Sequence, residues 1–395
     1  MTLVAPGPWL RLTALAAAAG TVLAVVSGAA HLGTAHRLLA ALVAPPLAAL
    51  VVAAWTAHRP LVPAVLAASA LFAAAAAAPG NDAHAALAAA ALAALLVVAV
   101  QSFRGEHVPW GAWRDYVALT KPRIMSLLLI TGFCGMIAGA QGWPGTGRAV
   151  AAMVGLALAC GGASALNHVI DRDIDPLMGE RTKKRPVASG RVAPSRALEF
   201  GLALSAFSFV LLASTVNVLT AVLALFGNAF YVVVYTRWLK RTTPQNIVIG
   251  GAAGAVPPLV GWAAATGNLT LAALLLFAIV FVWTPPHFWA LSILIKDNYK
   301  AAGVPMLPVV RGERETARQI VLYSLALVAV TLIPWFTGSA GPIYVVSALA
   351  LGAVFLWLAE RLRRETTKRG AMLLFHYSLL YLALLFVAFA VDAAV

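Results

Sequence analysis

The stretch that decides the fold is residues 149–175, which read AVAAMVGLALACGGASALNHVIDRDID. The part before Asp171 contains no Lys, Arg, Asp or Glu. A run of about 20 apolar and small residues is what an α-helix needs to cross a lipid bilayer. Three aspartates follow at once, at positions 171, 173 and 175. The stretch therefore predicts a membrane helix with an acidic cluster at one end.

Runs of the same kind recur along the whole chain. Of the 395 residues, 62% are hydrophobic and only 11% are charged, and the mean hydropathy is +0.89. A soluble protein carries about a quarter charged residues. Roughly thirteen runs between residues 10 and 392 are long and apolar enough to span a membrane. The composition excludes soluble, fibrous and disordered proteins and predicts an all-α polytopic membrane protein.

Positive charge is distributed unevenly between the two sides of the predicted bundle. The chain has 28 Lys and Arg against 14 Asp and Glu, a net charge of +14. If the N-terminus is cytoplasmic, only Arg37 and Arg148 lie in outer loops. Cytoplasmic loops of membrane proteins carry such an excess of Lys and Arg, so we expect the N-terminus and the charged loops on the cytoplasmic side of a cell membrane. A signal peptide after Arg11 is less favoured, because its removal would invert every later loop.

Composition also divides the chain into two parts. Residues 1–102 are rich in Ala and nearly free of acids, and a polar segment around residues 101–121 separates them from the rest. We expect a four-helix transmembrane extension over residues 1–102 and a nine-helix unit over residues 103–395. The long charged loops belong to the second unit, so chemistry that needs charge is expected there.

The acidic cluster has the spacing of a metal site. On a helix, Asn167, Asp171 and Asp175 are spaced i, i+4 and i+8 and share one face. Carboxylates one turn apart repel each other unless a cation lies between them. Mg²⁺ suits one or two carboxylates together with phosphate oxygens. A solvated acidic helix end explains the bare pattern equally well, and it is the preferred interpretation for Asp173, which points to the opposite face.

Many bases lie close to this cluster in the sequence. They include Arg181, Lys183 and Arg185 directly after it, and Lys121, Lys240 and Arg241 in the two adjacent inner loops. Acids beside so many bases fit a polyanion bridged by a metal ion, and a diphosphate is such a polyanion. The excess of positive charge in cytoplasmic loops explains most of these bases by itself, so only a few are expected to bind a ligand.

Four segments resemble one family of membrane enzymes. They are residues 167–192 (NHVIDRDIDPLMGERTKKRPVASGRV), 235–262 (YTRWLKRTTPQNIVIGGAAGAVPPLVGW), 283–291 (WTPPHFWAL) and 297–308 (DNYKAAGVPMLP). Together they look like the protoheme IX farnesyltransferases, or heme O synthases. That family belongs to the intramembrane prenyltransferase superfamily typified by 4-hydroxybenzoate polyprenyltransferase. The resemblance covers about residues 105–395. Two positions depart from it: the spacing from Met178 to Arg181 is one residue longer, and Asn298 stands where an acid is common.

The resemblance implies a fold, a reaction and a metal. The fold would be a nine-helix prenyltransferase bundle. The substrates would be farnesyl diphosphate and heme B, and transfer of the farnesyl group to the 2-vinyl group with addition of water would give heme O. Asn167, Asp171 and Asp175 would hold Mg²⁺ on the diphosphate.

The same resemblance implies which residues contact the two substrates. Those that would bind the diphosphate are Lys121, Arg181, Lys183, Arg185, Lys240 and Arg241. Those that would contact heme are His287, Trp283 and Tyr235. An interfacial aromatic belt explains His287 and Trp283 in a different way, and a structural hydroxyl explains Tyr235 equally well. Gly250, Gly251 and Gly254 read as a small-residue face for close helix packing.

Histidines stand out in the N-terminal extension. His31, His36 and His84 are expected at the outer edge of its helices. Two histidines that face each other across a bundle could ligate heme, but histidines in short loops are common, and this ordinary interpretation is preferred. The His36-Arg37 pair is loosely similar to heme A synthase, so that enzyme is a candidate partner.

Two other functions remain open. One is a related prenyltransferase that acts on an aromatic quinone precursor, although residues 283–291 and 297–308 argue against it. The other is a transporter, which would more often carry ionisable residues in the middle of the membrane. Here almost all ionisable residues lie at the inner edge, which favours chemistry at the interface.

Overall fold

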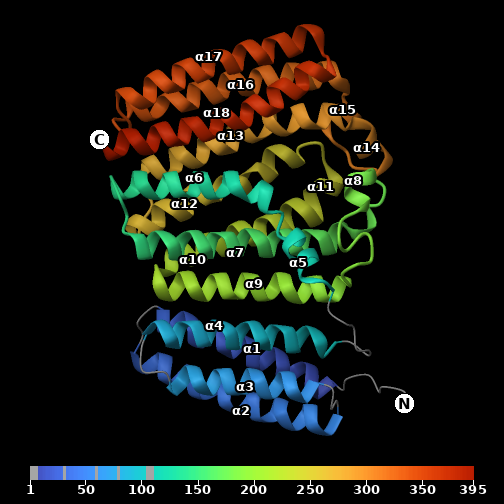
Figure 1. Cartoon of the computed structure of the whole chain (residues 1–395), viewed down its shortest axis with the longest axis vertical. Coiled ribbons are helices and arrows are strands. Elements are labelled where there is room, and N and C mark those ends of the chain that lie inside the picture. Colours follow the sequence, from blue (N-terminus) through green and yellow to red (C-terminus); the bar gives the residue numbers. More distant parts are fainter. Residues whose placement is uncertain (1–7, 30–32, 58–60, 78–80, 104–110) are drawn as a thin grey trace.

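The structure is a computed structural model that describes residues 8–29, 33–57, 61–77, 81–103 and 111–395. The described residues form helices and connecting turns. Figure 1 shows long, roughly parallel helices stacked in layers, with the N-terminal helices at one side of the stack. The all-α fold predicted from composition is confirmed.

Ten of the described helices are long and apolar enough to cross a membrane. Three shorter apolar helices, Leu39–Trp55, Val62–Ala77 and Leu87–Ser102, lie in the N-terminal part. All of them fall where the sequence predicts spans. The chain is therefore a multi-pass membrane protein, while the number of spans stays a prediction.

The N-terminal helices form a four-helix unit with an apolar cluster of its own, which includes Leu10, Val43 and Leu95. Its helices are α1 (Pro8–Ala29), α2 (Gly33–Ala57), α3 (Val62–Ala77) and α4 (Asn81–Gln101). A second cluster joins the unit to the core, because Ala89 and Leu92 pack with Val210. The unit is thus a layer laid against the core.

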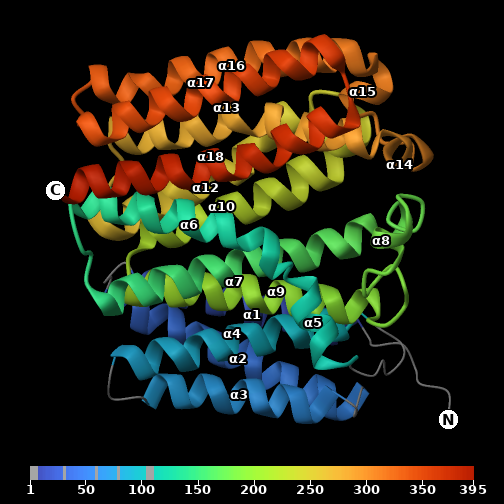
Figure 2. The same cartoon turned by 45° about the horizontal axis from the view of Figure 1, so that its top comes forward.

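Two kinds of helix build the core. The long helices are α6 (Pro122–Ala140), α7 (Thr146–Ile170), α9 (Pro194–Thr215), α10 (Val218–Ala229), α12 (Asn246–Thr266), α13 (Leu271–Leu294), α16 (Gly312–Phe336), α17 (Pro342–Glu365) and α18 (Lys368–Ala394). The short ones are α5 (Trp113–Leu119), α8 (Glu180–Lys183), α11 (Lys240–Thr242), α14 (Lys296–Ala301) and α15 (Leu307–Val310). Figures 1 and 2 both show α5, α8, α14 and α15 at the same end of the bundle. Charged connections are therefore gathered at one end.

Glycines allow α6 and α12 to cross at backbone contact. A Cβ atom built on Gly261 would lie 1.7 Å from the carbonyl oxygen of Gly132, which no side chain tolerates. The expected small-residue face on α12 is only partly present. Gly250 makes room for Tyr235 and Gly251 for Thr284, whereas Gly254 has open space beside it, so the prediction was wrong for Gly254.

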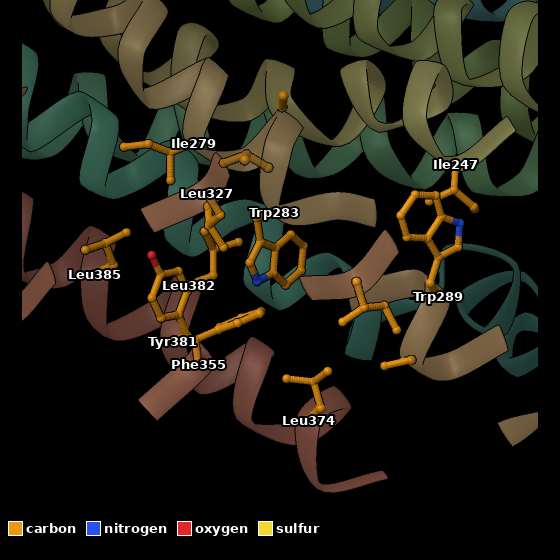
Figure 3. Close-up of a cluster of buried hydrophobic side chains, with 14 of the residues drawn as sticks. Ile247, Ile279, Trp283, Trp289, Leu327, Phe355, Leu374, Tyr381, Leu382 and Leu385 are labelled. Atoms are coloured by element: carbon orange, nitrogen blue, oxygen red, sulfur yellow. The ribbon is translucent and has the colours of Figure 1, made fainter. Parts of the chain in front are cut away.

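The largest apolar cluster lies between α13, α16, α17 and α18. Figure 3 shows Trp283 and Leu327 in this cluster, with Phe355 and Tyr381 from the last two helices. Trp289 lies at its other end, near Ile247 of α12. The cluster fixes α13 against the C-terminal helices, and α13 carries one of the four segments of interest.

Candidate active site

The acidic cluster lies where α7 ends. The α-helix stops at Ile170, and Asp171–Asp173 form a turn of 3-10 helix. The three side chains therefore do not lie on one continuous α-helix, which the argument from their spacing used. The i, i+4 relation survives, because the backbone amide of Asp175 donates to the carbonyl oxygen of Asp171 at 2.9 Å. Asp171 and Asp175 are both fully buried, so the two carboxylates still face inward.

Asn167 connects the acids to two other parts of the chain. Its Nδ2 donates to Asp171 Oδ2 at 2.8 Å and to Thr236 Oγ1 at 3.2 Å. Its Oδ1 accepts a hydrogen bond from Lys121 Nζ at 2.8 Å. The side chain is therefore held in one orientation by residues from three separate segments.

Basic side chains from two loops contact the aspartates directly. Lys240 Nζ lies 2.6 Å from Asp171 Oδ2, and Arg185 Nη1 lies 2.6 Å from Asp175 Oδ1. Lys240 is itself buried, and Arg185 reaches in from the segment after α8. With Lys121 this places three cations around two carboxylates.

One oxygen of each carboxylate remains without a hydrogen-bond partner. These atoms are Asp171 Oδ1 and Asp175 Oδ2, and both are buried. Buried carboxylate oxygens normally have partners, so the two atoms are available for an oxygen-loving cation. Among the described residues, no group of three or more His, Cys, Asp or Glu is placed to hold a metal ion. The donor set fits Mg²⁺, which takes one or two carboxylates and fills its shell with water and phosphate oxygens.

Lys121 has an unusual backbone conformation. It precedes Pro122 at the start of α6 with φ 49° and ψ 59°, the left-handed region. Such a conformation costs of order 1–3 kcal/mol and persists only where the surroundings impose it. Burial, together with the charges of Arg185 and Lys240, lowers the pKa of Lys121 to about 7. The residue with this conformation is thus the one whose buried amine donates to Asn167.

Burial acts on Asp175 in the opposite sense. It raises the pKa of this carboxyl, and Arg185 opposes that effect through its charge and its hydrogen bond. Burial removes the carboxyl group from water, which disfavours its charged form and so favours the protonated form. A divalent cation bound to this carboxyl would favour its ionised form.

Three predicted cations lie apart from this cluster. Arg181 is exposed on α8, and Lys183 on the same helix lies 3.9 Å from Glu180. Arg241 places both terminal nitrogens on Asp173, each at 2.7 Å, and only reaches within 3.8 Å of Asp171 Oδ1. The exposure of Asp173, predicted from its position on the helix, is confirmed.

A stretch of π-helix carries Tyr235 to the site. It spans Phe230–Leu239, and π-helical turns often occur at functional sites. Tyr231 and Tyr235 stack with ring centres 5.5 Å apart. Gly250 allows Tyr235 to lie against α12, because a Cβ there would be 2.3 Å from the tyrosine ring.

Sequence reasoning missed several residues at this site. Thr236 is fully buried beside Asn167, and only the π-helical turn brings it there. Burial raises the pKa of Tyr299 to about 12, while the charge of Arg185 lowers it and that of Asp171 raises it. Asn298 meets the loop after α7, since a Cβ on Gly179 would lie 2.7 Å from Asn298 Nδ2. Tyr299 could have been found from the sequence, because it lies in the segment 297–308, one of the four that resemble the family.

His287 and Trp283 occupy a different environment. The imidazole stacks on Trp283 at 4.3 Å between ring centres and on Phe375 at 4.8 Å. Its Nδ1 forms a 2.7 Å hydrogen bond with Ser378 Oγ, and Trp283 Nε1 donates to the Ser378 carbonyl oxygen. These contacts hold the imidazole of His287 in one orientation, and its contact with heme stays a prediction.

Known proteins match the core of this chain. Residues 128–388 match the UbiA prenyltransferase family. A protoheme IX farnesyltransferase of Symbiobacterium thermophilum is 53% identical over 281 residues, which are 71% of this chain and 94% of that protein. One from Marinobacter nauticus is 51% identical over 286 residues, with 72% and 94% covered. The protoheme IX farnesyltransferase of Thermus thermophilus is 53% identical over 283 residues, but these are only 46% of its own length.

Solved structures share the fold. A digeranylgeranylglyceryl phosphate synthase superposes with a TM-score of 0.60 and 18% identity, over 71% of this chain and 98% of that one. A UbiA homolog from Archaeoglobus fulgidus bound to GPP and Mg²⁺ gives 0.53 and 16%, over 71% and 99%. At these identities the likeness concerns the arrangement of helices alone.

Proposed function

The chain belongs to the UbiA prenyltransferase family, and from this premise we propose that it is a protoheme IX farnesyltransferase. It transfers the farnesyl group of farnesyl diphosphate to the 2-vinyl group of heme B, with addition of water, and the products are heme O and diphosphate. The observation that carries prenyl transfer is that Asp171 and Asp175, beside three basic side chains, each have one buried carboxylate oxygen that accepts no hydrogen bond. The names of relatives about half identical in sequence support heme as the acceptor.

Asp171 and Asp175 are the proposed Mg²⁺ ligands. A bound Mg²⁺ supplies positive charge against the diphosphate oxygens. Asn167 completes the proposed set, although Lys121 occupies its Oδ1 in this structure. When Lys121 turns to a phosphate oxygen, the amide oxygen becomes available. The solved structure of a relative with GPP and Mg²⁺ supports a metal-dependent reaction of this class.

The basic residues act on the leaving group. When the bond between the farnesyl carbon and the diphosphate oxygen breaks, the oxygen keeps the electron pair and gains charge. Lys121, Arg185 and Lys240 lie beside the proposed metal ligands, and charges held in place in this way stabilise a transition state. We also propose diphosphate contacts for Arg181, Lys183 and Arg241. They are expected to contribute less, because Arg181 and Lys183 are exposed, Arg241 binds Asp173, and none of the three lies in the buried cluster.

The acceptor step needs an apolar wall and a single water. The vinyl carbon of heme B forms a bond to the farnesyl carbon, and water then adds to the resulting cation and loses a proton. We propose that Tyr235 contacts heme B, the acceptor, on the side of the aspartates. We propose that Trp283 and His287 pack behind the apolar residues that contact heme B. His287 stacks on Trp283 and on Phe375, which fits this position.

The location follows from the charge distribution. We place the end of the bundle with α5, α8, α14 and α15 on the cytoplasmic side of the cell membrane, because cytoplasmic loops are rich in Lys and Arg. Catalysis is assigned to residues 103–395 and not to the four-helix extension over residues 1–102. The family match begins at residue 128, in line with this division. Heme A synthase is a candidate partner for the extension.

The test is a reaction with defined substrates. Purified full-length protein is incubated with heme B, farnesyl diphosphate and Mg²⁺, and heme O is measured by mass. The product should form only with Mg²⁺ present, and a chelator should stop it. Replacing heme B with 4-hydroxybenzoate tests the alternative acceptor. A prenylated benzoate with no heme O would replace the proposed function by that of a related prenyltransferase, and the absence of any prenylated product would favour a transporter.

A further inference from the structure

Polar contacts in the N-terminal unit and in the core differ in what they connect. His36 and His84 each bond a backbone carbonyl oxygen of a neighbouring helix, and their rings touch edge to face with centres 5.7 Å apart. These contacts stay within the four-helix unit. His31 lies outside the described residues. In the core, by contrast, Arg191 joins two segments that lead to the active site.

Arg191 connects α5 with the chain that follows α8. Its Nε donates to Asp115 Oδ1 of α5 at 2.8 Å, and its Nη2 donates to the backbone carbonyl oxygen of Lys184 at 3.0 Å. Asp115 and Arg191 are 76 positions apart in the sequence. An arginine can serve two acceptors at once, because its donors are held in a planar fork. One side chain therefore ties the two segments together.

The α5 end of this connection is fixed to α7. Tyr116 and Leu119 of α5 are buried in an apolar cluster that includes Ala165 of α7. Ser164 Oγ of α7 donates to the Leu119 carbonyl oxygen at 2.6 Å, and this bond is buried. The helix that anchors α5 is also the one that ends at the acidic cluster. Asp115 therefore has a defined position relative to the carboxylates.

The other end of the connection carries an active-site cation. Backbone hydrogen bonds within residues 184–192 fold this segment into a compact turn. At its start, Arg185 places Nη1 2.6 Å from Asp175 Oδ1. Lys184 directly precedes Arg185. The bond from Arg191 thus fixes the backbone at the point from which Arg185 reaches the carboxylate.

Stability alone does not explain this arrangement. Exposed ion pairs contribute little to the stability of a fold, and the Arg191 side chain is 47% exposed. Val187 of the turn is buried in the same apolar cluster as α5, so the turn should stay near the site without Arg191. Placement is more sensitive, since a shift of about 1 Å in a group that acts on the reaction can lower the rate by about 100-fold.

We propose that Arg191, held by Asp115, is a positioning residue that orients the guanidinium of Arg185 toward the departing diphosphate. Arg191 itself contacts no substrate in this role. The inference rests on the proposed function only in assigning Arg185 to the diphosphate. It gives α5, which lies outside the four segments that resemble the family, a part in the reaction.

The experiment measures diphosphate release in a single turnover of purified full-length protein with farnesyl diphosphate, heme B and Mg²⁺. Arg191→Gln and Asp115→Ala should each lower the rate by about 10-fold, because Arg185 is then less well placed. The unfolding temperature should change little. Arg363→Gln is the matched control, since Arg363 also donates from Nε and Nη2 to a carboxylate, that of Glu360, but lies on α17, away from α5 (Figures 1 and 2). It should leave the rate unchanged.

A double-mutant cycle separates positioning from a merely structural role. If Arg191 acts through Arg185, Arg191→Gln should have less than about a 2-fold further effect in a protein that already carries Arg185→Gln. A structural role would give the same loss in both backgrounds and would overturn the proposal, as would an unchanged rate in Arg191→Gln.

Arg191→Lys guards against a variant that fails to fold. It keeps the positive charge but presents a single ammonium group to two acceptors. Its rate of diphosphate release should therefore lie between those of wild type and Arg191→Gln. A wild-type rate in this variant would overturn the proposal, because the charge alone would then suffice.

Diphosphate is released whichever acceptor is used, so the measurement separates this inference from the proposed function. Diphosphate release without heme O would reject heme as the acceptor, and the effect of Arg191→Gln would still decide the inference. Heme O formed by Arg191→Gln at the wild-type rate would reject the inference alone. A wild-type protein that releases no diphosphate would reject both.

Discussion

The end of α7 and the surroundings of His287 are both buried and polar, yet they differ in how their hydrogen-bonding capacity is used. Asp171 and Asp175 each keep one buried oxygen that accepts no hydrogen bond, although cations surround them and Arg241 lies 3.8 Å from that of Asp171. His287, by contrast, forms a hydrogen bond at Nδ1 and stacks on the rings of Trp283 and Phe375. A buried polar atom without a hydrogen bond costs free energy in the absence of a ligand. A hydrogen bond that is already formed within the protein stabilises the fold. The comparison therefore separates a binding site from a packed interior.

The largest effect is expected at the unfilled oxygens. Asp171→Asn and Asp175→Asn should each lower heme O formation by at least about 100-fold, because each variant removes a metal ligand and that loss costs several kcal/mol. The Mg²⁺ concentration for half-maximal rate should rise if activity remains measurable. Asp173→Asn is the matched control, since this exposed acid contacts Arg241, and it should stay within a few-fold of wild type. Near-normal product from either buried variant would remove the metal assignment.

The next effect concerns the cations beside those oxygens. Lys240→Gln and Arg185→Gln should each lower the rate at which the bond between the farnesyl carbon and the diphosphate breaks by about 10- to 100-fold. Loss of one preorganised charge at a leaving group has an effect of this size. Lys184→Gln is the matched control, because this lysine directly after α8 is exposed and is not among the proposed diphosphate contacts. Single-turnover measurement of diphosphate separates this step from product release. Equal losses for the three variants would mean that burial does not distinguish these cations.

A smaller and different effect is expected at His287. His287→Ala should lower the free energy of unfolding by about 1–3 kcal/mol, because it removes two ring contacts and leaves the Ser378 hydroxyl without this partner. Both substrates should then bind less well, in proportion to the loss of folded protein. His287→Phe keeps the stacking surface and should recover most of the stability. The measurements are thermal unfolding and two binding assays, for heme B and for a farnesyl diphosphate analogue. A selective loss of heme affinity would show that His287 contacts heme directly.

The parts of this picture that local sequence controls could be predicted. Runs of apolar residues gave the membrane helices, because length and hydropathy alone decide whether a helix can span a bilayer. The spacing of Asn167, Asp171 and Asp175 predicted that their side chains converge. That convergence holds even though α7 stops at Ile170, since the backbone bond from Asp175 to Asp171 preserves the turn.

The parts that depend on distant segments could not be predicted in this way. Arg181 and Arg185 look alike in the sequence, but only Arg185 reaches a buried carboxylate. The left-handed conformation of Lys121 and the π-helix that delivers Thr236 have no periodic signature. Ser378 lies 91 residues from the histidine it bonds. These features arise from packing between helices, which a pattern along one chain does not contain.

The smallest effect is expected from removing the N-terminal unit. A chain that begins near Gly105 retains the buried carboxylates, the three cations and the packed surroundings of His287. The Symbiobacterium relative is matched over 94% of its length, so the part outside the match is too short for a four-helix unit, and it carries the same family name as the others. The truncated protein should therefore make heme O at a rate within a few-fold of the full chain, with lipid covering the face of α9 that α4 leaves exposed. Heme O formation in matched membranes is the measurement, with the heme content of both proteins as a second one. If the shortened chain inserts normally yet makes no heme O, residues 103–395 are not a complete catalytic unit, and the contrast between unfilled and filled polar groups would not suffice to locate the chemistry.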